Sequence, residues 1–302
     1  MDSKSIFIKE LYNDYSLKPS SQYILDRYDL IANNYMCYEI YCDNTNYCVF
    51  GIVHGHSEVI GLGYLDVSKS IVRALVDFIF KNHPELREIS FSNLTFGLGH
   101  HVQYKSYKIP LPSTDTVLHK RLSPKGWYNI RRERRLIDEE VGESSFVEYD
   151  LNTIPDSLVE QYFEMKGRTH YGGYGLTPKQ YLERYHVTNA YALLSGNIVL
   201  SIIFSCEQLD DVFLENLTYN TDFSRFSPGQ VLYDFYLTRL ILKGKNTLYL
   251  GGGNYSYKER YGSIKETLYV SKVFRNKLYF ACFVLNKLYE KVILSLRINH
   301  RK

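Results

Sequence analysis

The chain has 302 residues, enough for two domains or one large one, and 45% of them are hydrophobic and 23% charged. This balance is typical of an ordinary soluble globular protein. A net charge of +3 is too small to indicate nucleic-acid binding by itself. No apolar run reaches the roughly 20 residues that a membrane-spanning helix needs, and the N-terminus has no signal-peptide pattern. We therefore expect a cytoplasmic protein.

The cysteines and histidines do not form a recognisable metal motif. The cysteine count of 5 is odd, and the spacing of Cys37, Cys42 and Cys48 does not follow the CxxC pattern. His54 and His56 share one face of an expected strand but have no acidic or cysteine companion at ligand spacing. We expect free thiols in a reducing compartment and no bound metal.

The first half predicts strands followed by a helix and a further strand. Runs of β-branched and aromatic residues indicate the strands, and apolar residues recur at helical spacing between Ile71 and Ile79. The dipeptide His83-Pro84 ends that helix. The expected elements are strands at 35–42, 47–54, 58–64 and 87–94 and a helix at 68–82.

A charged helix is expected between two halves of the chain. Ser123 is a suitable N-cap, Pro124 fits the first turn, and the basic run from Arg131 to Arg135 continues into an acidic end. The basic run is typical of a solvated helix face, or of a face that receives a diphosphate or a tRNA backbone. We place the domain boundary after this helix, which gives domains of residues 1–145 and 146–302.

The second half repeats the order of strand, helix and strand. Thr177, Pro178 and Gln180 predict a capped helix start, and Gly196-Asn197 predicts a hairpin. The expected elements are helices at 155–165 and 229–243, strands at 190–195, 198–206, 211–220 and 247–250, and a docked C-terminal helix at 278–296.

The segment from Arg225 to Gln230 is the most informative part of the sequence. Ser227, Pro228 and Gly229 open a helix directly after an expected buried strand. Such a start leaves free backbone N–H groups at the positive end of the helix, which is a suitable site for a phosphate or pyrophosphate. The segment therefore indicates an enzyme that binds a phosphorylated carrier.

Three segments carry a resemblance to a known family: the helix start at Ser227–Gly229, the run Tyr257–Gly262 after a glycine-rich turn, and the helix from Trp127 to Arg135. With them the chain resembles tandem GNAT acyltransferases of the cellulose-biosynthesis (CelD-like) type. That group is related to FemABX peptidyl transferases and to CoA-dependent N-acyltransferases of nucleotide-linked amino sugars. The resemblance extends over essentially the whole chain. The run Arg225-Phe-Ser-Pro-Gly-Gln replaces the usual Gln/Arg-x-x-Gly-x-Gly/Ala motif, in a form associated with the tandem families.

The resemblance implies an α/β fold of two tandem GNAT-like domains, each a mixed, mostly antiparallel sheet flanked by helices. The second domain is expected to bind acyl-CoA and the first, a degenerate copy, to shape the acceptor pocket. In the first half the corresponding helix start, Leu65–Lys69, has no glycine and contains an acid that would repel pyrophosphate. The residues expected to contact acyl-CoA are Asn216, Leu217, Thr218, Arg225, Ser227, Gly229, Gln230, Asn254, Tyr255 and Lys258.

Three residues are candidates for proton transfer. Glu215 lies mid-strand among apolar residues, which can raise a carboxyl pKa toward neutrality, so it is the candidate general base; an ion pair with an arginine is the structural alternative. Tyr257, or else Tyr255, is the candidate acid for the thiolate leaving group. His170 lies in a glycine-flanked aromatic loop that either covers an acceptor or is a surface turn.

The leading hypothesis is an N-acyltransferase that moves an acyl group from acyl-CoA to the amine of a dTDP- or UDP-linked amino sugar for surface polysaccharide synthesis. The amine would attack the thioester directly. We expect a small-molecule acceptor and no nucleic-acid partner, and a homo-oligomer is compatible with the sequence. One alternative is a FemABX-like aminoacyl transferase that uses charged tRNA. Another is a non-catalytic binding module on a GNAT scaffold.

Overall fold

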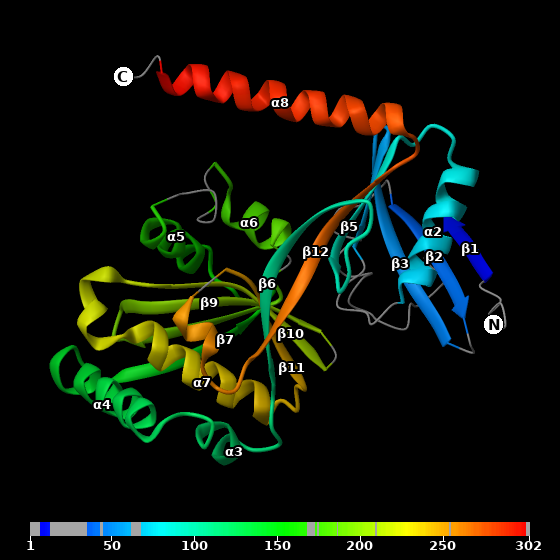
Figure 1. The fold of residues 1–302 in the computed structure, drawn as a ribbon. Helices are drawn as coiled ribbons and strands as arrows, with labels where there is room; N and C mark the ends of the chain where they lie inside the picture. Colours follow the sequence, from blue (N-terminus) through cyan, green and yellow to red (C-terminus); the bar gives the residue numbers. More distant parts are fainter. Residues whose placement is uncertain are drawn as a thin grey trace. The chain divides into compact units, whose positions relative to one another are not determined.

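The computed structural model describes residues 7–12, 35–42, 45–61, 68–167, 173, 175–185, 187–208, 210–253 and 255–299. The chain divides into two compact units (Figure 1). The first comprises residues 1–104 and 267–302, and the second comprises residues 105–266. The chain passes from one unit to the other within strands β6 and β12.

The first unit contains a mostly antiparallel sheet with strand order β1-β2-β3-β4-β5-β12, in which only β4 and β5 are parallel. Its strands are β1 (Phe7–Tyr12), β2 (Tyr35–Cys42), β3 (Thr45–His54), β4 (Ser57–Gly61), β5 (Glu88–Leu94) and most of β12 (Ile264–Phe274). Helix α2 (Lys69–Asn82) begins at the N-cap Ser68, whose side chain accepts from the Ile71 N–H. Its apolar face packs into the core of this unit.

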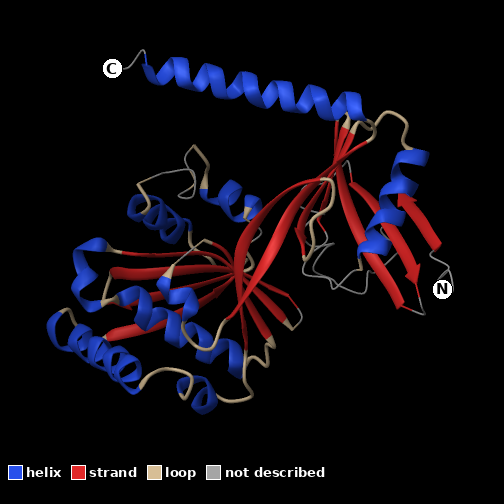
Figure 2. Cartoon of the chain, viewed as in Figure 1, coloured by secondary structure: helices blue, strands red, loops and turns tan. Residues whose placement is uncertain are grey.

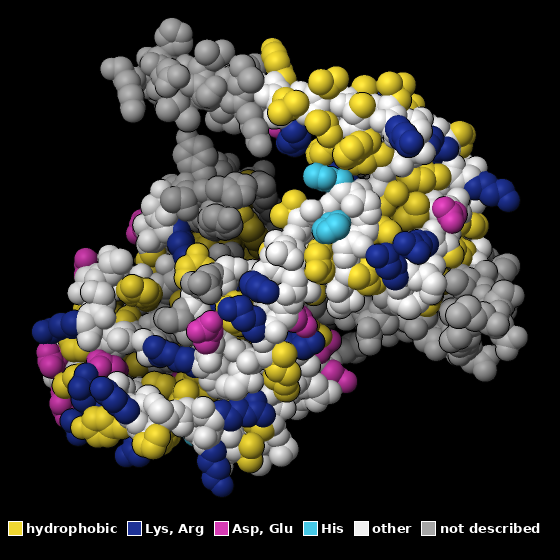
Figure 3. All heavy atoms as spheres, viewed as in Figure 1, with side chains coloured by type: hydrophobic (Ala, Val, Ile, Leu, Met, Phe, Trp, Pro, Cys, Tyr) yellow, Lys and Arg dark blue, Asp and Glu magenta, His cyan; other side chains and the backbone are white. Residues whose placement is uncertain are grey.

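The C-terminal helix α8 (Lys277–Asn299) is attached to this unit through its first turns. The ring of Phe283 contacts those of His100 and Phe274, with centroid distances of 5.3 and 5.1 Å. The opposite face leaves Leu285 and Tyr289 exposed, and Figure 3 shows hydrophobic side chains along it. None of the described helices is long and apolar enough to cross a membrane.

The second unit contains a sheet with strand order β6-β11-β10-β9-β8-β7, in which only β10 and β11 are parallel. Its strands are β6 (His100–Pro110), β7 (Ser144–Asp150), β8 (Asn189–Ser195), β9 (Ile198–Gln208), β10 (Asp211–Tyr219) and β11 (Thr247–Gly252). Its helices are α3 (Asp115–His119), α4 (Pro124–Glu140), α5 (Asp156–Met165), α6 (Pro178–Arg184) and α7 (Pro228–Leu242), with short 3-10 helices η2 (Thr221–Phe226) and η3 (Ser256–Glu259).

Helices cover both faces of this second sheet (Figure 2). Helices α4 and α7 pack on one face together with Tyr191 and Leu193, and α5 and α6 pack on the other with Ala190 and Ala192. Successive residues of β8 thus enter different cores, as the two-residue period of a strand requires. Two helix-covered faces explain why β8 carries apolar side chains on both of its faces.

The expected elements agree closely with those of the structure, and the capping box between Thr177 and Gln180 is present. Sequence reasoning did not predict strands β1, β6, β7 and β12 or the short helix α3. Because β6 pairs with β11 and β12 pairs with β5, each expected half contributes a strand to the sheet containing the other half's strands. The compact units therefore have different bounds from the proposed domains 1–145 and 146–302. The separate roles of those domains stay a prediction.

Candidate active site

Strands β10 and β11 are paired only where they begin. Their parallel register joins Asp211–Phe213 to Thr247–Tyr249, although β10 continues to Tyr219. Beyond Phe213, β10 stays paired with β9 on its other side. The backbone of Leu214–Tyr219 thus has no ladder partner on the β11 side within the described residues, and the two strands diverge there.

A β-bulge marks the point of divergence. The register with β9 shifts between Leu214 and Asn216, so Glu215 is the inserted residue. A bulge increases local twist and redirects the following side chains, and bulges are frequent beside active sites. Glu215 is half-buried; burial raises the pKa of the neighbouring Tyr181 hydroxyl, and the Glu215 charge is a minor further contribution to that rise. The carboxylate of Glu215 is not among the residues that line the cavity described below, so its role as the base stays a prediction.

Helix α7 begins opposite this opening. Its start follows η2 through Ser227, a non-glycine residue in the left-handed region with φ of 48°. Such strained backbone in a non-glycine residue costs on the order of 1–3 kcal/mol and is concentrated at functional sites. Pro228 occupies the first turn, where its missing N–H is not needed. The buried Gly229 faces β10, since a Cβ there would lie 3.4 Å from Tyr219 Cδ1 and 3.5 Å from Leu217 Cδ2.

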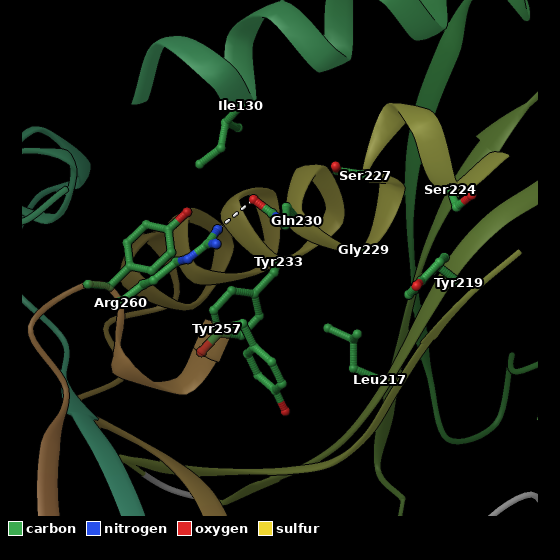
Figure 4. Close-up of a pocket in the computed structure, with 11 residues that line it drawn as sticks. Ile130, Leu217, Tyr219, Ser224, Ser227, Gly229, Gln230, Tyr233, Tyr257 and Arg260 are labelled. Atoms are coloured by element: carbon green, nitrogen blue, oxygen red, sulfur yellow. Dashed lines mark hydrogen bonds between the residues drawn. The ribbon is translucent and has the colours of Figure 1, made fainter. Parts of the chain in front are cut away.

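A cavity of about 230 Å³ lies between the start of α7 and the diverging part of β10; we call it the β10 cavity. Its lining comprises Ile130, Leu217, Tyr219, Ser224, Ser227, Gly229, Gln230, Tyr233, Tyr257, Arg260 and Tyr261. In Figure 4, Leu217 and Tyr257 approach it from opposite sides. An apolar cavity with a few polar groups is the usual form of a small-molecule site.

Tyr257 is the predicted proton-transfer residue that lines this cavity. Burial raises the pKa of its hydroxyl to about 12, so the group stays protonated at neutral pH. Its ring packs edge-on against Tyr233, with the centroids 5.5 Å apart. This arrangement fits a proton donor and does not fit a base.

A hydrogen-bonded chain connects the cavity wall to a buried carboxylate. Tyr261 donates its hydroxyl to Asp234 Oδ1 at 2.8 Å, and His119 Nε2 lies 3.1 Å from the same oxygen. Burial raises the pKa of Asp234. The ring of His119 is stacked on Trp127 of α4, 3.8 Å away. Tyr261 also has a positive φ, 58°, so a second strained residue lines this cavity.

The predicted donor-site residues divide into those at the cavity and those elsewhere. Leu217, Ser227, Gly229 and Gln230 line it. Arg225 lies just before the helix start, but its guanidinium pairs with Glu140 at 2.8 Å. Asn216 and Thr218 point elsewhere. Asn216 Nδ2 donates to Tyr181 Oη at 2.8 Å, and Thr218 is buried, with its carbonyl accepting from Ser201 Oγ. His170 and Asn254 lie outside the described residues.

Lys258 and Tyr255 lie beside the end of β11. The Lys258 ammonium is buried and donates to the carbonyls of Leu250 and Gly252. Burial lowers the pKa of Lys258 to about 8. Tyr255 is exposed and its ring stacks with that of Tyr257. Both residues thus support the segment that positions Tyr257, and their contact with a donor stays a prediction.

Sequence reasoning assigned no site role to Tyr219, Tyr233 and Tyr261, and it gave Ile130 none. Among 29 tyrosines no pattern distinguishes those at the cavity. The left-handed φ of Tyr261, 58°, is rare for a bulky residue and could not be predicted from the sequence. Ile130 reaches the cavity from α4, which only tertiary packing reveals.

Among the described residues there is no group of three or more His, Cys, Asp or Glu side chains arranged to hold a metal ion. The polar groups around the β10 cavity are hydroxyls, an amide, a guanidinium and the backbone N–H of Gly229. The chemistry available there is hydrogen bonding and proton donation toward a bound anion or carbonyl.

Comparison with known proteins identifies the fold. Residues 124–259 match the sequence profile of the family described as an acetyltransferase (GNAT) domain. No curated protein matches the chain significantly. These residues include α4, the start of α7 and the lining of the β10 cavity except Arg260 and Tyr261.

Solved structures agree in fold. FemX is similar with a TM-score of 0.59 and 9% identity, over 86% of this chain and 96% of that one. The C-terminal DUF2156 domain of a protein assigned as a lysylphosphatidylglycerol synthetase of Agrobacterium fabrum has a TM-score of 0.53 and 11% identity. The similarity covers 80% of this chain and 84% of that one. L-PGS of Bacillus licheniformis has a TM-score of 0.51 and 10% identity, over 83% of this chain and 88% of that one. At these identities the similarity concerns the fold alone.

The chain has a tandem GNAT-like α/β fold with mixed, mostly antiparallel sheets flanked by helices, as the sequence predicts. The matched domain is the one that contains the β10 cavity. The fold and the family match assign a GNAT-like domain to residues 124–259, which contain most of the β10 cavity.

Proposed function

We propose that this protein is an N-acyltransferase that takes its acyl group from acyl-CoA. The observation that carries the proposal is the β10 cavity, which lies where β10 leaves β11 and ends at the start of α7. A carrier with a phosphorylated end and a long amide-containing arm fits both features. The phosphates would bind at the helix start, and the arm would extend along the strand.

The free edge of β10 supports the placement of the arm. The backbone groups of Leu214–Tyr219 have no ladder partner on the β11 side in the described structure. An extended ligand can use such an edge as an added strand, with its amides hydrogen-bonded to the backbone. The two amides of the pantetheine arm have this character.

The helix start supports the placement of the pyrophosphate. Pro228 has no N–H, and the Gln230 N–H is directed to the Ser227 carbonyl at 2.8 Å. The Gly229 N–H is at the positive end of α7, and no side chain intervenes because the residue is glycine. Ser227 Oγ makes no capping hydrogen bond, so it is available to a ligand.

The reaction follows from these positions. A neutral amine attacks the thioester carbonyl carbon, a C–N bond forms, the C–S bond breaks, and the thiolate takes up a proton. In this proposal Glu215 at the bulge accepts the proton that the amine loses. Tyr257, whose pKa of about 12 keeps it protonated, donates to the thiolate. Holding the amine beside the thioester can supply several kcal/mol of barrier lowering, on the order of 7–11 in favourable cases.

The proposed acceptor is the amine of a nucleotide-linked amino sugar, with the product serving surface polysaccharide synthesis. The support is the family resemblance together with the tyrosine hydroxyls of the cavity wall, which suit sugar hydroxyls. We propose that the domain of residues 1–145 shapes the acceptor pocket. His170 stays a candidate residue at the acceptor.

A FemABX-like aminoacyl transfer from charged tRNA is the second candidate. The similarity to the fold of FemX favours it. The modest net charge of +3 disfavours a broad tRNA-binding surface. A binding module without catalysis is the third reading, and it differs by showing acyl-CoA binding without turnover on any acceptor.

Isothermal titration with CoA and acetyl-CoA tests the proposal. Micromolar or tighter binding of acetyl-CoA, followed by thiol release with dTDP- or UDP-linked amino sugars, is the expected result. Binding of neither ligand would exclude the acyl-CoA donor, and acyl transfer from charged tRNA would then replace it.

A further inference from the structure

A second cavity, of about 480 Å³, adjoins the β10 cavity; we call it the α4 cavity. Its lining comprises Arg121, Leu122, Ser123, Lys125, Gly126, Asn129, Ile130, Glu133, Ser227, Gln230, Glu259, Arg260 and Tyr261. Five of these residues also line the β10 cavity. A ligand at the start of α7 can therefore extend into both.

Three cations surround the α4 cavity without a carboxylate partner among the described residues. Arg121 donates to the carbonyl oxygens of Pro110 and Tyr261, at 2.6 and 3.4 Å. Arg260 Nη1 donates to Gln230 Oε1 at 2.5 Å. Lys125 is exposed in the first turn of α4. Their hydrogen bonds to neutral oxygens fix two of the side chains and leave all three charges uncompensated.

The two acids of the cavity do not cancel this charge, because each has its own cation. Glu259 Oε1 lies 3.7 Å from Lys265 Nζ. Glu133 Oε1 accepts from Arg132 at 2.6 Å. The cavity is therefore electropositive and suited to several anionic groups on one ligand.

Glu133 is a hydrogen-bond acceptor in this otherwise electropositive cavity. It is only 8% exposed, and its Oε2 has no hydrogen-bond partner in the described structure. A buried carboxylate oxygen without a donor is costly, because it has lost its water without gaining a hydrogen bond. A ligand that carried only phosphates would leave this oxygen unpaired. The cavity is therefore suited to a ligand that carries both anionic groups and hydroxyl or amino hydrogen-bond donors.

We propose that the α4 cavity binds the phosphorylated adenosine end of the acyl donor, with Arg121 and Lys125 at its phosphates and Glu133 accepting from its ribose or adenine. This inference rests on the proposed acyl-CoA function. Ser227, Gln230 and Arg260 belong to both cavities and hold the diphosphate between the two ends of the donor. Helix α4 thereby selects the donor by its nucleotide, at a distance from the thioester.

Competition titrations test the nucleotide site separately from the acyl site. The probes are adenosine 3′,5′-bisphosphate, UDP, acetyl-CoA and S-acetylpantetheine, with the full chain. We expect adenosine 3′,5′-bisphosphate to compete with acetyl-CoA and UDP to compete at least tenfold less well. If acetyl-CoA binds and the bisphosphate does not compete, or UDP competes better, the nucleotide site is overturned while the acyl-CoA function stands. If the bisphosphate binds but neither acetyl compound does, the nucleotide site stands and the acyl-CoA function fails.

Two variants identify the residues. Lys125→Ala should weaken the binding of the bisphosphate and of acetyl-CoA about fivefold, as expected for the loss of one exposed ion pair. The affinity for S-acetylpantetheine should stay unchanged. Lys120→Ala, also exposed and outside the cavity lining, is the matched control and should change neither. Equal effects of the two variants would overturn the role of Lys125.

Glu133→Gln distinguishes a hydrogen bond to the adenosine from the general effect of the Glu133 charge on anion binding. Removal of the negative charge should strengthen the binding of inorganic pyrophosphate, whereas replacement of one acceptor oxygen by an NH2 donor should weaken the binding of adenosine 3′,5′-bisphosphate. Tighter binding of both would overturn the assigned contact. Thermal unfolding of the variant shows whether the fold is retained, and Glu133→Asp, which keeps the carboxylate, should restore part of the affinity for the bisphosphate.

Discussion

Substitution of Gly229 by aspartate should weaken ligand binding and at the same time stabilise helix α7. Gly229 is the second residue of α7 and faces the β10 cavity. A Cβ there would make ordinary contacts of 3.4–3.5 Å with Tyr219 and Leu217, so the backbone accommodates a side chain. The carboxylate would then occupy the position proposed for the pyrophosphate.

The expected magnitude follows from the charges. Two unit charges about 4 Å apart interact by about 4 kcal/mol at an effective dielectric constant of about 20. Gly229→Asp should therefore weaken the binding of acetyl-CoA by a factor on the order of a thousand. Stability should rise, because aspartate in the first turn gains about 0.3–1 kcal/mol from the helix dipole and glycine is a poor helix former.

Isothermal titration and urea unfolding measure the two effects. Gly229→Asn has the same size without the charge, and Gly229→Ala tests the added Cβ alone. The difference between the aspartate and asparagine variants should shrink as salt is raised, because screening weakens the repulsion. Unchanged affinity in Gly229→Asp would refute the phosphate assignment, and equal losses in the aspartate and asparagine variants would show a steric effect only.

Three further predictions concern catalysis and stability. Glu215→Gln should lower kcat about a hundredfold with acetyl-CoA affinity within about twofold, by thiol-release kinetics; full activity would place the base elsewhere. Tyr257→Phe should lower kcat about tenfold without changing KM for acetyl-CoA, and a wild-type kcat would exclude its role as the acid. Burial by itself would raise the pKa of Glu148, but hydrogen bonds from Lys243 and Arg239, both 2.6 Å long, outweigh it and lower the pKa below 4.5. The stability from this carboxylate is therefore present above about pH 4.5 and lost as the pH falls. Glu148→Gln should flatten the acid side of the stability profile in urea unfolding, and an unchanged slope would contradict the assignment.

Local patterns in the sequence account for most of the secondary structure. The capping box at Thr177 and the Pro228 start of α7 specify helix starts through interactions within one turn, which sequence alone displays. Strands β6 and β12 were missed because their sequences mix polar and apolar residues without a clear alternation. Their positions depend on pairing with β11 and β5, far away in the sequence.

The sequence by itself determined the start of α7, because Pro228 suits the first turn of a helix and Gly229 leaves its backbone N–H uncovered by a side chain. The sequence also placed Tyr257 after the strand that follows α7, which is β11 in the structure. Tertiary structure alone decided that Glu215 occupies a bulge, since a bulge is a mismatch between two strands. Packing of α4 against α7 likewise decided that Glu133 and Lys125 lie beside the same helix start. These residues are about a hundred positions away from α7, and no local interaction along the chain relates them.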